Sequence, residues 1–455
     1  MKKKLTWKNY LYVGSMLFGL FFGAGNLIFP VHLGQEAGAH VFSANLGFLV
    51  TGIGLPFLGI LVMGISQCNS SIELAERISR PYALIFTFIL TLTLGPLFTI
   101  PRLATTSFEI GLAPFFQKSS HTVVLAVFSV IFFLFAWLFS KSPSKLLDYI
   151  GKFLNPLFLF FLAILLILAF IHPLGNISSA PIGDAYSTSA FFKGFTDGYN
   201  TLDALGSFML AVVIISTIRG MGGVTEPKDI AKDTIKSGII TVILMGVIYT
   251  LLAYVGTMSV GHFAISSNGG IALTQIATHY LGNGGLVLLA TIVILACLKT
   301  AIGLITACSE TFMKLFSNIS YKFFILSISI FACLFTNVGL TNIIQFSLPV
   351  LMFLYPLTIT LMLLALFGSL FNNRKEVYQI TTLFTFFAAF LDMLNNSPAI
   401  IRESRLVVPI LEMAEKYLPL FSIGMGWTTP AAFGFILSIL WIILPKYKIN
   451  YLKKS

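Results

Sequence analysis

An apolar stretch near the N-terminus, from Gly14 to Gly34, is broken at its middle, and this break limits what the chain can fold into. The interruption is Gly23-Ala24-Gly25-Asn26, and Pro30 follows it. Each glycine costs about 1 kcal/mol relative to alanine inside a helix. A backbone break at membrane depth is tolerated only where it is buried in protein or faces water. We therefore expect two half-helices around a binding site, with a Gly-rich helix-packing face as the alternative.

The rest of the chain is composed like a membrane protein. It has 455 residues, of which 57% are hydrophobic and only 10% charged. Apolar runs of membrane-spanning length recur along its whole length, which predicts an all-α polytopic membrane protein and excludes an ordinary soluble one. About twelve transmembrane helices are expected, at residues 10–31, 42–65, 82–111, 122–139, 146–171, 195–217, 237–260, 285–311, 322–338, 343–368, 377–394 and 427–445.

The basic residues predict the orientation in the membrane. With a cytoplasmic N-terminus, 20 of the 28 Lys and Arg residues fall in inner segments and 5 in outer loops. Basic residues concentrate on the cytoplasmic side, so both termini are expected there, in a multi-pass protein of the cell membrane. The net charge of +11 lies mostly in these short segments and does not indicate a nucleic-acid partner.

Catalytic signatures are missing from the sequence. The four cysteines lack metal-site and C-x-x-C spacing, and no nucleophile motif or phosphate-binding loop is present. We therefore expect no enzyme activity, no cofactor beyond a transported Na⁺ or H⁺, and no obligate protein partner. A channel would show a selectivity filter or a ring of like charges. A channel or membrane sensor is the less favoured alternative.

A second interruption occurs at the start of the sixth predicted span. The segment from Gly198 to Ser207 carries small and polar residues, including Asp203. Corresponding breaks in two halves of a membrane protein indicate a transporter site, and five spans per half make the second half inverted. This predicts a first repeat at residues 1–171, a second, inverted repeat at 172–368 and two additional helices at 369–455.

Five motifs along the chain resemble one family. They are GAGNLIFP at 23–30, GPLFTIPR at 95–102, the segment 198–206, GGVTE at 222–226 and ACLKTAIGL at 296–304. Together they resemble the bacterial branched-chain amino acid transport carriers, the leucine/isoleucine/valine:cation symporter family. The resemblance implies import of leucine, isoleucine and valine, driven by a sodium or proton gradient. It also implies the leucine-transporter fold, a 5+5 inverted repeat with broken helices 1 and 6.

The resemblance and the two breaks point to the same substrate site. Backbone N–H groups at a helix N-terminus bind a carboxylate, whereas free carbonyls bind an ammonium group. We expect Gly25, Asn26 and Leu27 to face the carboxylate, and the ammonium group to lie near Gly23, Ala24, Thr201, Leu202 and Asp203, with Gly206 permitting close approach. The branched side chain is expected between spans three, six and eight. For Asp203, helix capping and substrate contact both remain open.

A cation site follows from the resemblance, with one departure. Sodium-coupled members of the fold hold sodium between carbonyls of span one and hydroxyls of span eight. Carried over by motif, these positions are Gly19, Phe22, Lys299 and Thr300. Lys299 places an ammonium group where a neutral oxygen is expected. Three interpretations remain. The ammonium group of Lys299 replaces the sodium ion, or it gains and loses a proton during transport. In the third, it points into a water-filled cavity beside an intact sodium site.

Span three contains two more charged residues. Arg102 and Glu109 lie one heptad apart on its outer half. An arginine within a membrane span indicates a functional role. We expect these two residues to form a gate or a structural ion pair rather than to touch substrate.

Overall fold

The computed structural model describes residues 5–23, 25–68, 70–141, 146–222 and 227–452, and these residues form helices and connecting segments without a β-strand. The all-α expectation is therefore confirmed. The α-helices are α1 (Trp7–Phe21), α2 (Gly25–Ala37), α3 (Val41–Leu49), α4 (Leu55–Ser66), α5 (Ser71–Ala75), α6 (Arg80–Leu92), α7 (Thr99–Gly111), α8 (His121–Ser140), α9 (Leu146–Ile171), α10 (Ala190–Asp197), α11 (Asp203–Gly222), α12 (Pro227–Ser259), α13 (Gly269–Leu315), α14 (Tyr321–Thr336), α15 (Leu340–Leu366), α16 (Lys375–Asn395), α17 (Ala399–Arg402), α18 (Val408–Tyr417) and α19 (Thr428–Leu452).

Both predicted helix breaks are present. Helix α1 ends before Phe22, whose backbone is extended (φ −74°, ψ 97°), and α2 starts at Gly25. Ala24, part of the predicted interruption, lies outside the described residues. The sixth span consists of α10, the 3₁₀ turn η8 (Gly198–Thr201) and α11, separated by Leu202 in the left-handed region at φ 64°.

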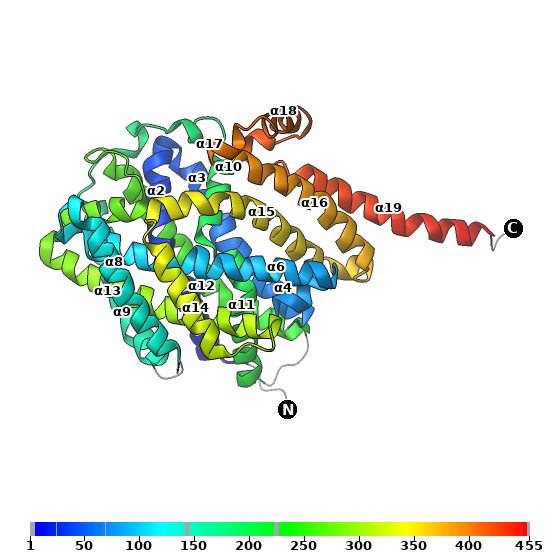
Figure 1. Ribbon diagram of the computed structural model, residues 1–455, viewed down its shortest axis with the longest axis horizontal. Helices are drawn as coiled ribbons and strands as arrows, with labels where there is room; N and C mark the ends of the chain where they lie inside the picture. The colour runs from blue at the N-terminus through cyan, green and yellow to red at the C-terminus, as the bar shows by residue number, and fades with distance from the viewer. Residues whose placement is uncertain (1–4, 24, 69, 142–145, 223–226, 453–455) are drawn as a thin grey trace.

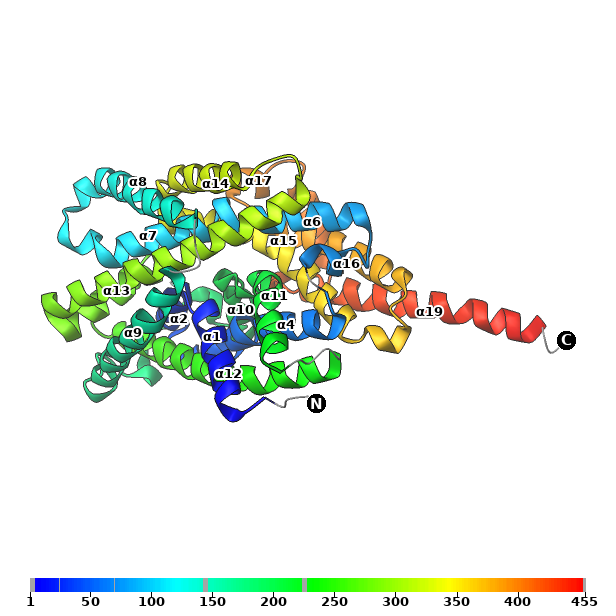
Figure 2. The same ribbon diagram turned by 90° about the horizontal axis from the view of Figure 1, so that it is seen from below.

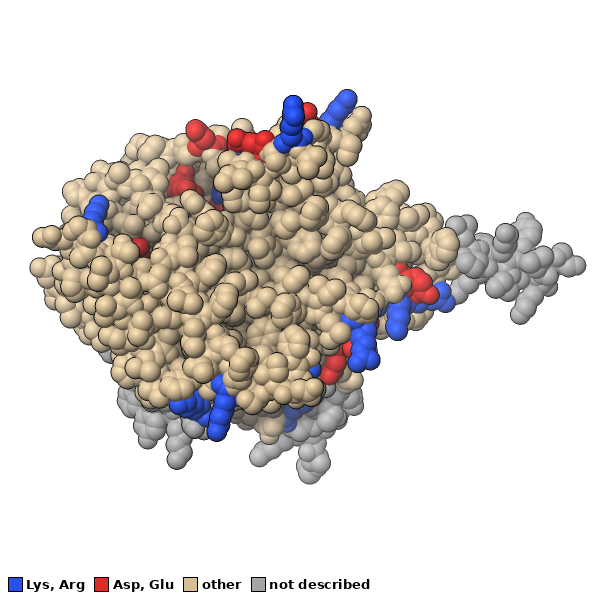
Figure 3. All heavy atoms as spheres, viewed as in Figure 1, with Lys and Arg blue, Asp and Glu red and all other residues tan. Residues whose placement is uncertain are grey.

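The lengths and surfaces of the helices suit a membrane. Among the described residues, seven helical stretches are long and apolar enough to cross a membrane, and three shorter apolar helices add to them. Exposed large hydrophobic residues are numerous on α8, α14, α16 and α19. Figure 3 shows charged side chains gathered toward the edges of one face, with a broad uncharged area between. The number of twelve spans remains a prediction.

The helices converge around the two breaks. Helix α13 packs along α7, α12 along α2, and α15 along α16 (Figures 1 and 2). Helix α16 also packs along α19, whose C-terminal end extends away from the rest of the molecule (Figure 1). Helices α2, α3, α12 and α15 all contact the turn η8 or its neighbours, so the breaks lie inside the bundle.

Close contact with α12 positions the second half of span one. A Cβ atom added to Gly34 of α2 would lie 1.9 Å from the carbonyl oxygen of Ala253, and one added to Gly256 would lie 2.1 Å from that of Val31. The hydroxyl of Thr257 donates a hydrogen bond to the Gly34 carbonyl at 2.8 Å. Small residues allow helix backbones in membranes to approach this closely. The second half of α2 is thereby held against α12 of the seventh span.

Candidate functional site: two broken helices joined by polar side chains

A hydrogen bond joins the two breaks directly. The side-chain nitrogen Nδ2 of Asn26, in the first turn of α2, donates to Oδ2 of Asp203, the first residue of α11, at 2.5 Å. Asn26 is buried, whereas Asp203 is partly exposed. A hydrogen bond to an ionised carboxylate is about twice as strong as one between neutral groups. The predicted site residues Asn26 and Asp203 are thus brought together from opposite halves of the chain.

Asn26 also organises the end of the first break. Its Oδ1 accepts a hydrogen bond from the backbone N–H of Gly23 at 2.9 Å. Its Nδ2 donates to the hydroxyl of Tyr249 on α12, in addition to Asp203. The first N–H groups of α2, at Gly25, Asn26 and Leu27, have no acceptor within the helix. They provide the positive end of a helix dipole at this level.

The second break is stabilised by its own side chains. The hydroxyl of Thr201 donates to the carbonyl of Gly198 at 3.0 Å and accepts from the N–H of Asp203 at 3.4 Å. Within the described residues, the carboxylate of Asp203 accepts no hydrogen bond from the backbone of α11. It faces Asn26 and so points across the break toward span one.

Tyrosines that sequence reasoning missed line the same region. Tyr199 of η8 stacks on Tyr355 of α15, with ring centroids 4.0 Å apart. Tyr249 packs edge-on against Phe48 and near Phe22. All three tyrosines are fully buried. The sequence does contain one indication of this role, since all three tyrosines lie in the middle of apolar spans. A tyrosine hydroxyl buried in a membrane needs a polar partner.

Arg102 contacts the second break rather than Glu109. Its guanidinium donates to the carbonyl oxygen of Asn200 at 2.8 Å and to the hydroxyl of Ser347 on α15, and it lies 5.5 Å from the ring centroid of Phe29. No ion pair joins Arg102 to Glu109 among the residues described. A positive charge is favourable at the carboxyl end of a helix. Arg102 therefore stabilises the end of the turn η8, which follows α10.

The four predicted cation-site residues lie on two helices. Gly19 is in α1 and Phe22 directly follows it, while Lys299 and Thr300 lie near the middle of α13. The hydroxyl of Thr300 donates to the carbonyl of Ala296 in its own helix at 3.0 Å. Lys299 is partly exposed and forms no ion pair within the part of the chain that the structure describes.

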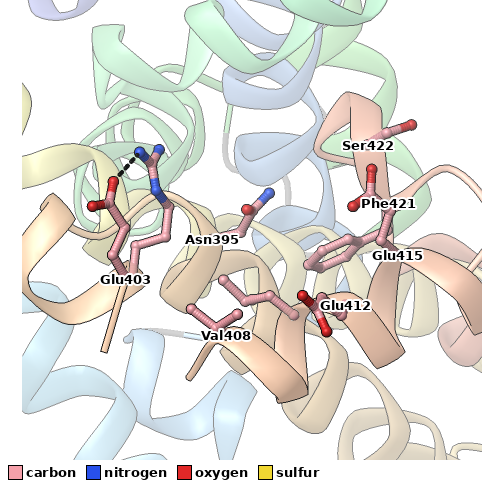
Figure 4. Close-up of a pocket in the computed structure, with 9 residues that line it drawn as sticks. Asn395, Glu403, Val408, Glu412, Glu415, Phe421 and Ser422 are labelled. Carbon is pink, nitrogen blue, oxygen red and sulfur yellow. Dashed lines mark hydrogen bonds and ion pairs between the residues drawn. The ribbon is translucent and has the colours of Figure 1, made fainter. Parts of the chain in front are cut away.

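A separate pocket of about 330 Å³ opens beside the additional helices (Figure 4). It lies at the C-terminal end of α16, under α17 and α18. Three of its lining residues are glutamates, and Glu403 is paired with Arg402 at 3.3 Å. The residues around it are Asn395, Arg402, Glu403, Val408, Leu411, Glu412, Glu415, Phe421 and Ser422.

Two broken helices that meet inside an apolar bundle, with polar side chains joining them, define the molecule as a multi-pass membrane transporter. The comparisons with known proteins agree. Residues 6–444 match the family of branched-chain amino acid transport proteins, and the chain belongs to this family. The family resemblance that the motifs indicate is therefore confirmed. The family consists of membrane transport proteins rather than enzymes.

Two curated relatives cover nearly the whole chain. A branched-chain amino acid permease, BrnQ, of Lactobacillus delbrueckii subsp. lactis is 45% identical over 98% of this chain and 100% of its own length. The permease of the same name from Bacillus subtilis is 42% identical over 96% of this chain and 99% of its own.

A solved structure shows the same fold. The inward-facing conformation of Mhp1 superposes with a TM-score of 0.63 at 13% identity, over 98% of this chain and 92% of that one. At this identity the similarity concerns the fold alone. It confirms the fold class expected from the broken helices.

The contacts of Arg102 predict a measurable effect on stability. Arg102→Lys keeps the charge but loses the planar pair of donors that reaches both Asn200 and Ser347. We expect the variant to lose about 2 kcal/mol, because two buried acceptors are left without a donor. Thermal unfolding of the purified protein in detergent measures the change.

The matched control is Arg402→Lys. Arg402 is exposed and, among the described residues, is paired with the neighbouring Glu403. Exposed ion pairs contribute about 0–1 kcal/mol, so the control should melt close to the unaltered protein. Equal melting temperatures for both variants would show that the Arg102 contacts do not stabilise the fold.

Proposed function

We propose that the protein imports leucine, isoleucine and valine by secondary active transport, coupled to a gradient of sodium or protons. The observation that carries the proposal is the bond between Asn26 and Asp203, which places opposite ends of two broken helices at one point in a branched-chain amino acid transport protein. The relatives named BrnQ support the substrate class. The repeats at 1–171 and 172–368, the additional helices at 369–455 and the cytoplasmic location of both termini belong to this proposal.

The substrate carboxylate binds at the start of α2 in this proposal. The free N–H groups at Gly25, Asn26 and Leu27 supply donors and the positive end of the helix dipole. Gly25 has little room for a side chain, since an added Cβ atom would lie 3.1 Å from the ring of Phe29. A glycine at this position lets a ligand approach the backbone closely.

The substrate ammonium group binds at the second break. The carboxylate of Asp203 offers a charged acceptor, and the carbonyls of Gly23, Thr201 and Leu202 offer neutral ones. Ala24 was expected to add another carbonyl, but it lies outside the described residues. When an ammonium group arrives, it replaces Asn26 as a donor to Asp203. Because Asn26 already donates a hydrogen bond to Asp203 when no substrate is bound, the empty site does not leave a buried carboxylate without a donor.

The branched side chain points along α11 toward span three. A Cβ atom added to Gly206 would meet only Leu94, at 4.0 Å, so there is space beside this glycine. Leu94 lies in a kinked segment of span three, where Gly95 has non-helical backbone angles (φ −91°, ψ −119°). The sulfur of Cys308, on α13, lies 3.2 Å from the position of an added Cβ at Gly95. Spans three, six and eight therefore supply apolar surroundings for the side chain.

Two roles remain for the coupling ion near Lys299. In the main proposal a transported cation binds near Gly19, Phe22 and Thr300. In the alternative, Lys299 acts as a tethered cation, and the protein is a sodium-independent exchanger or facilitator. The observation that favours the alternative is the position of Lys299 inside α13 without an acidic partner among the described residues. A fixed positive charge a few ångströms away opposes cation binding.

Transport in proteoliposomes tests the substrate. Leucine, isoleucine and valine should each be accumulated and should compete with one another, because the surroundings of Gly206 are neutral and apolar. Lysine and glutamate should not compete, because an apolar pocket cannot solvate a second charge. Uptake of lysine or glutamate that is unaffected by excess leucine would overturn the proposed substrate class.

Gly25→Leu should abolish leucine binding while the protein still inserts and folds. The new side chain occupies the space in front of the α2 N-terminus and meets Phe29. Thermal stabilisation of the purified variant by leucine is the measurement, with Gly246→Leu on α12 as control. A Cβ at Gly246 meets nothing within 4 Å, so this control should keep the response. Stabilisation of Gly25→Leu equal to the unaltered protein would contradict the placement.

Replacement of sodium by choline tests Lys299. Leucine uptake is measured in vesicles at two pH values for the unaltered protein, Lys299→Thr and the exposed control Lys314→Thr on the same helix. If Lys299 acts as a tethered cation, sodium dependence appears only in Lys299→Thr, because removing the ammonium group restores a neutral oxygen. Strict sodium dependence of the unaltered protein would rule the tethered cation out.

A further inference from the structure

A buried carboxylate lies outside the substrate site, on the first of the two additional helices. Asp392 is on α16, three residues before the helix ends, and its side chain is 0% exposed. An ionisable residue buried within a span is costly and suggests a function. The role of Asp392 is not explained by the contacts of the two breaks.

Three polar groups meet at Asp392 without completing hydrogen bonds. Both carboxylate oxygens of Asp392, the hydroxyl of Tyr199 and the indole nitrogen of Trp427 are buried and unpaired. Trp427 lies beside the carboxylate, since a Cβ atom added to the neighbouring Gly426 would lie 3.2 Å from Oδ1 of Asp392, and Tyr199 lies within electrostatic range of Asp392. Buried polar groups are nearly always paired. Tyr199 of η8, Asp392 of α16 and Trp427, which directly precedes α19, therefore form a buried polar site.

The chemistry of this site suits a proton better than a metal cation. The indole nitrogen of Trp427 is a donor only. Donors repel a bound cation, and the carboxylate alone does not provide the oxygen ligands that a sodium ion needs. A proton requires one carboxylate oxygen and no further ligand. It also removes the cost of a buried charge.

Other charged groups do not compete for the carboxylate. In α15 the one titratable residue is Tyr355, and in η8 it is Tyr199. Helix α19 has no titratable residue before Lys446, about 27 Å along the helix from Thr428 at 1.5 Å per residue. Helices α17 and α18 carry Arg402, Glu412, Glu415, Lys416 and Tyr417 near the outer pocket, where Arg402 is paired with Glu403.

The pocket under α17 and α18, which we take to face the outer side, gives protons a short route to Asp392. Asn395 lines that pocket and follows Asp392 by three residues, so the two share one face of α16. A Cβ atom added to Gly426 would lie 3.2 Å from Oδ1 of Asp392 and 2.7 Å from the ring of Phe421, which also lines the pocket. Figure 4 shows Glu412 and Glu415 beside Phe421. One layer of side chains therefore separates an acidic pocket from the buried carboxylate.

Tyr199 connects Asp392 to the broken sixth span. It stacks on Tyr355 at 4.0 Å, and the next residue, Asn200, offers the carbonyl that Arg102 binds. Thr201 and Asp203 follow in the substrate site. A change in the hydrogen bonds of the Tyr199 hydroxyl thus acts on the backbone turn that carries the substrate contacts.

We propose that Asp392, with Tyr199 and Trp427, forms the proton-binding site that couples a proton gradient to amino acid transport. The proposal rests on the proposed function and names its coupling ion. A proton from the outer side adds to one carboxylate oxygen, which then donates a hydrogen bond to the Tyr199 oxygen. When the proton leaves toward the inner side, the carboxylate accepts hydrogen bonds from Tyr199 and Trp427 instead. The donor and acceptor roles of Tyr199 reverse between the two states.

Proteoliposomes that hold a pH-sensitive dye test the proposal with the full-length protein. Two readings are taken: leucine-driven proton movement, and exchange of labelled for unlabelled leucine without any ion gradient. Asp392→Asn keeps the shape of the side chain but cannot bind a proton. We expect leucine-driven proton movement to fall by about tenfold or more, while exchange continues. The control Glu376→Gln, at the exposed start of the same helix, should keep both activities.

The two readings separate the proposals. Failure of the unaltered protein to exchange leucine would overturn the proposed function itself. Exchange with sodium-driven uptake and no proton movement, or full proton coupling in Asp392→Asn, would overturn the role of Asp392 alone. If Asp392→Asn does not reconstitute, Asp392→Glu decides, because it retains a carboxylate. It should keep proton movement with a shifted pH profile, and an unchanged profile would contradict the proposal.

Discussion

The hydrogen bond between Asn26 and Asp203 satisfies a constraint that the membrane imposes on both breaks. A backbone that leaves the helix inside an apolar environment exposes donors and acceptors that lipid cannot pair. Asn26 pairs the N–H of Gly23 with one end of its amide and reaches Asp203 and Tyr249 with the other. The same few atoms therefore stabilise the end of span one, fix span six beside it and anchor both to α12. Further along α2, the close packing through Gly34 and Gly256 continues the contact with α12 that Asn26 begins.

The breaks were predictable because they are local. Clustered glycines weaken a helix through a local, sequence-readable cost, so Gly23, Gly25 and the segment from Gly198 could be recognised in the sequence alone. The family resemblance then indicated which residues beside each break bind the substrate. The partner of Arg102 was not predictable in this way. Its heptad spacing to Glu109 suggested a pair within one helix, whereas its guanidinium reaches Asn200 and Ser347, which are about 100 and 250 residues distant in the sequence. Contacts of this kind depend on how the helices cross, which periodicity does not reveal.

Tyrosines were overlooked for a related physical reason. In sequence, Tyr199, Tyr249 and Tyr355 look like ordinary aromatic residues of apolar spans. In the structure their hydroxyls lie where the breaks leave polar groups, and Tyr249 completes the pairing of Asn26. An aromatic residue with one polar atom suits the boundary between an apolar pocket and a polar break. Its role becomes visible only when the breaks of the two halves are placed side by side.

Charge balance links the substrate site to Asp392. Arg102 donates to the second break and Asp203 joins it to the first, so one basic and one acidic side chain lie beside the breaks and their formal charges balance. A branched-chain amino acid is a zwitterion and adds no net charge. An ionised Asp392 would leave one uncompensated negative charge beside Tyr199, and in a low-dielectric interior such a charge is expensive. A proton on Asp392 removes this charge without disturbing either half of the substrate site. The additional helices α16 and α19 thereby give the transporter a place to bind its coupling ion apart from its substrate, joined to it through the turn at Tyr199.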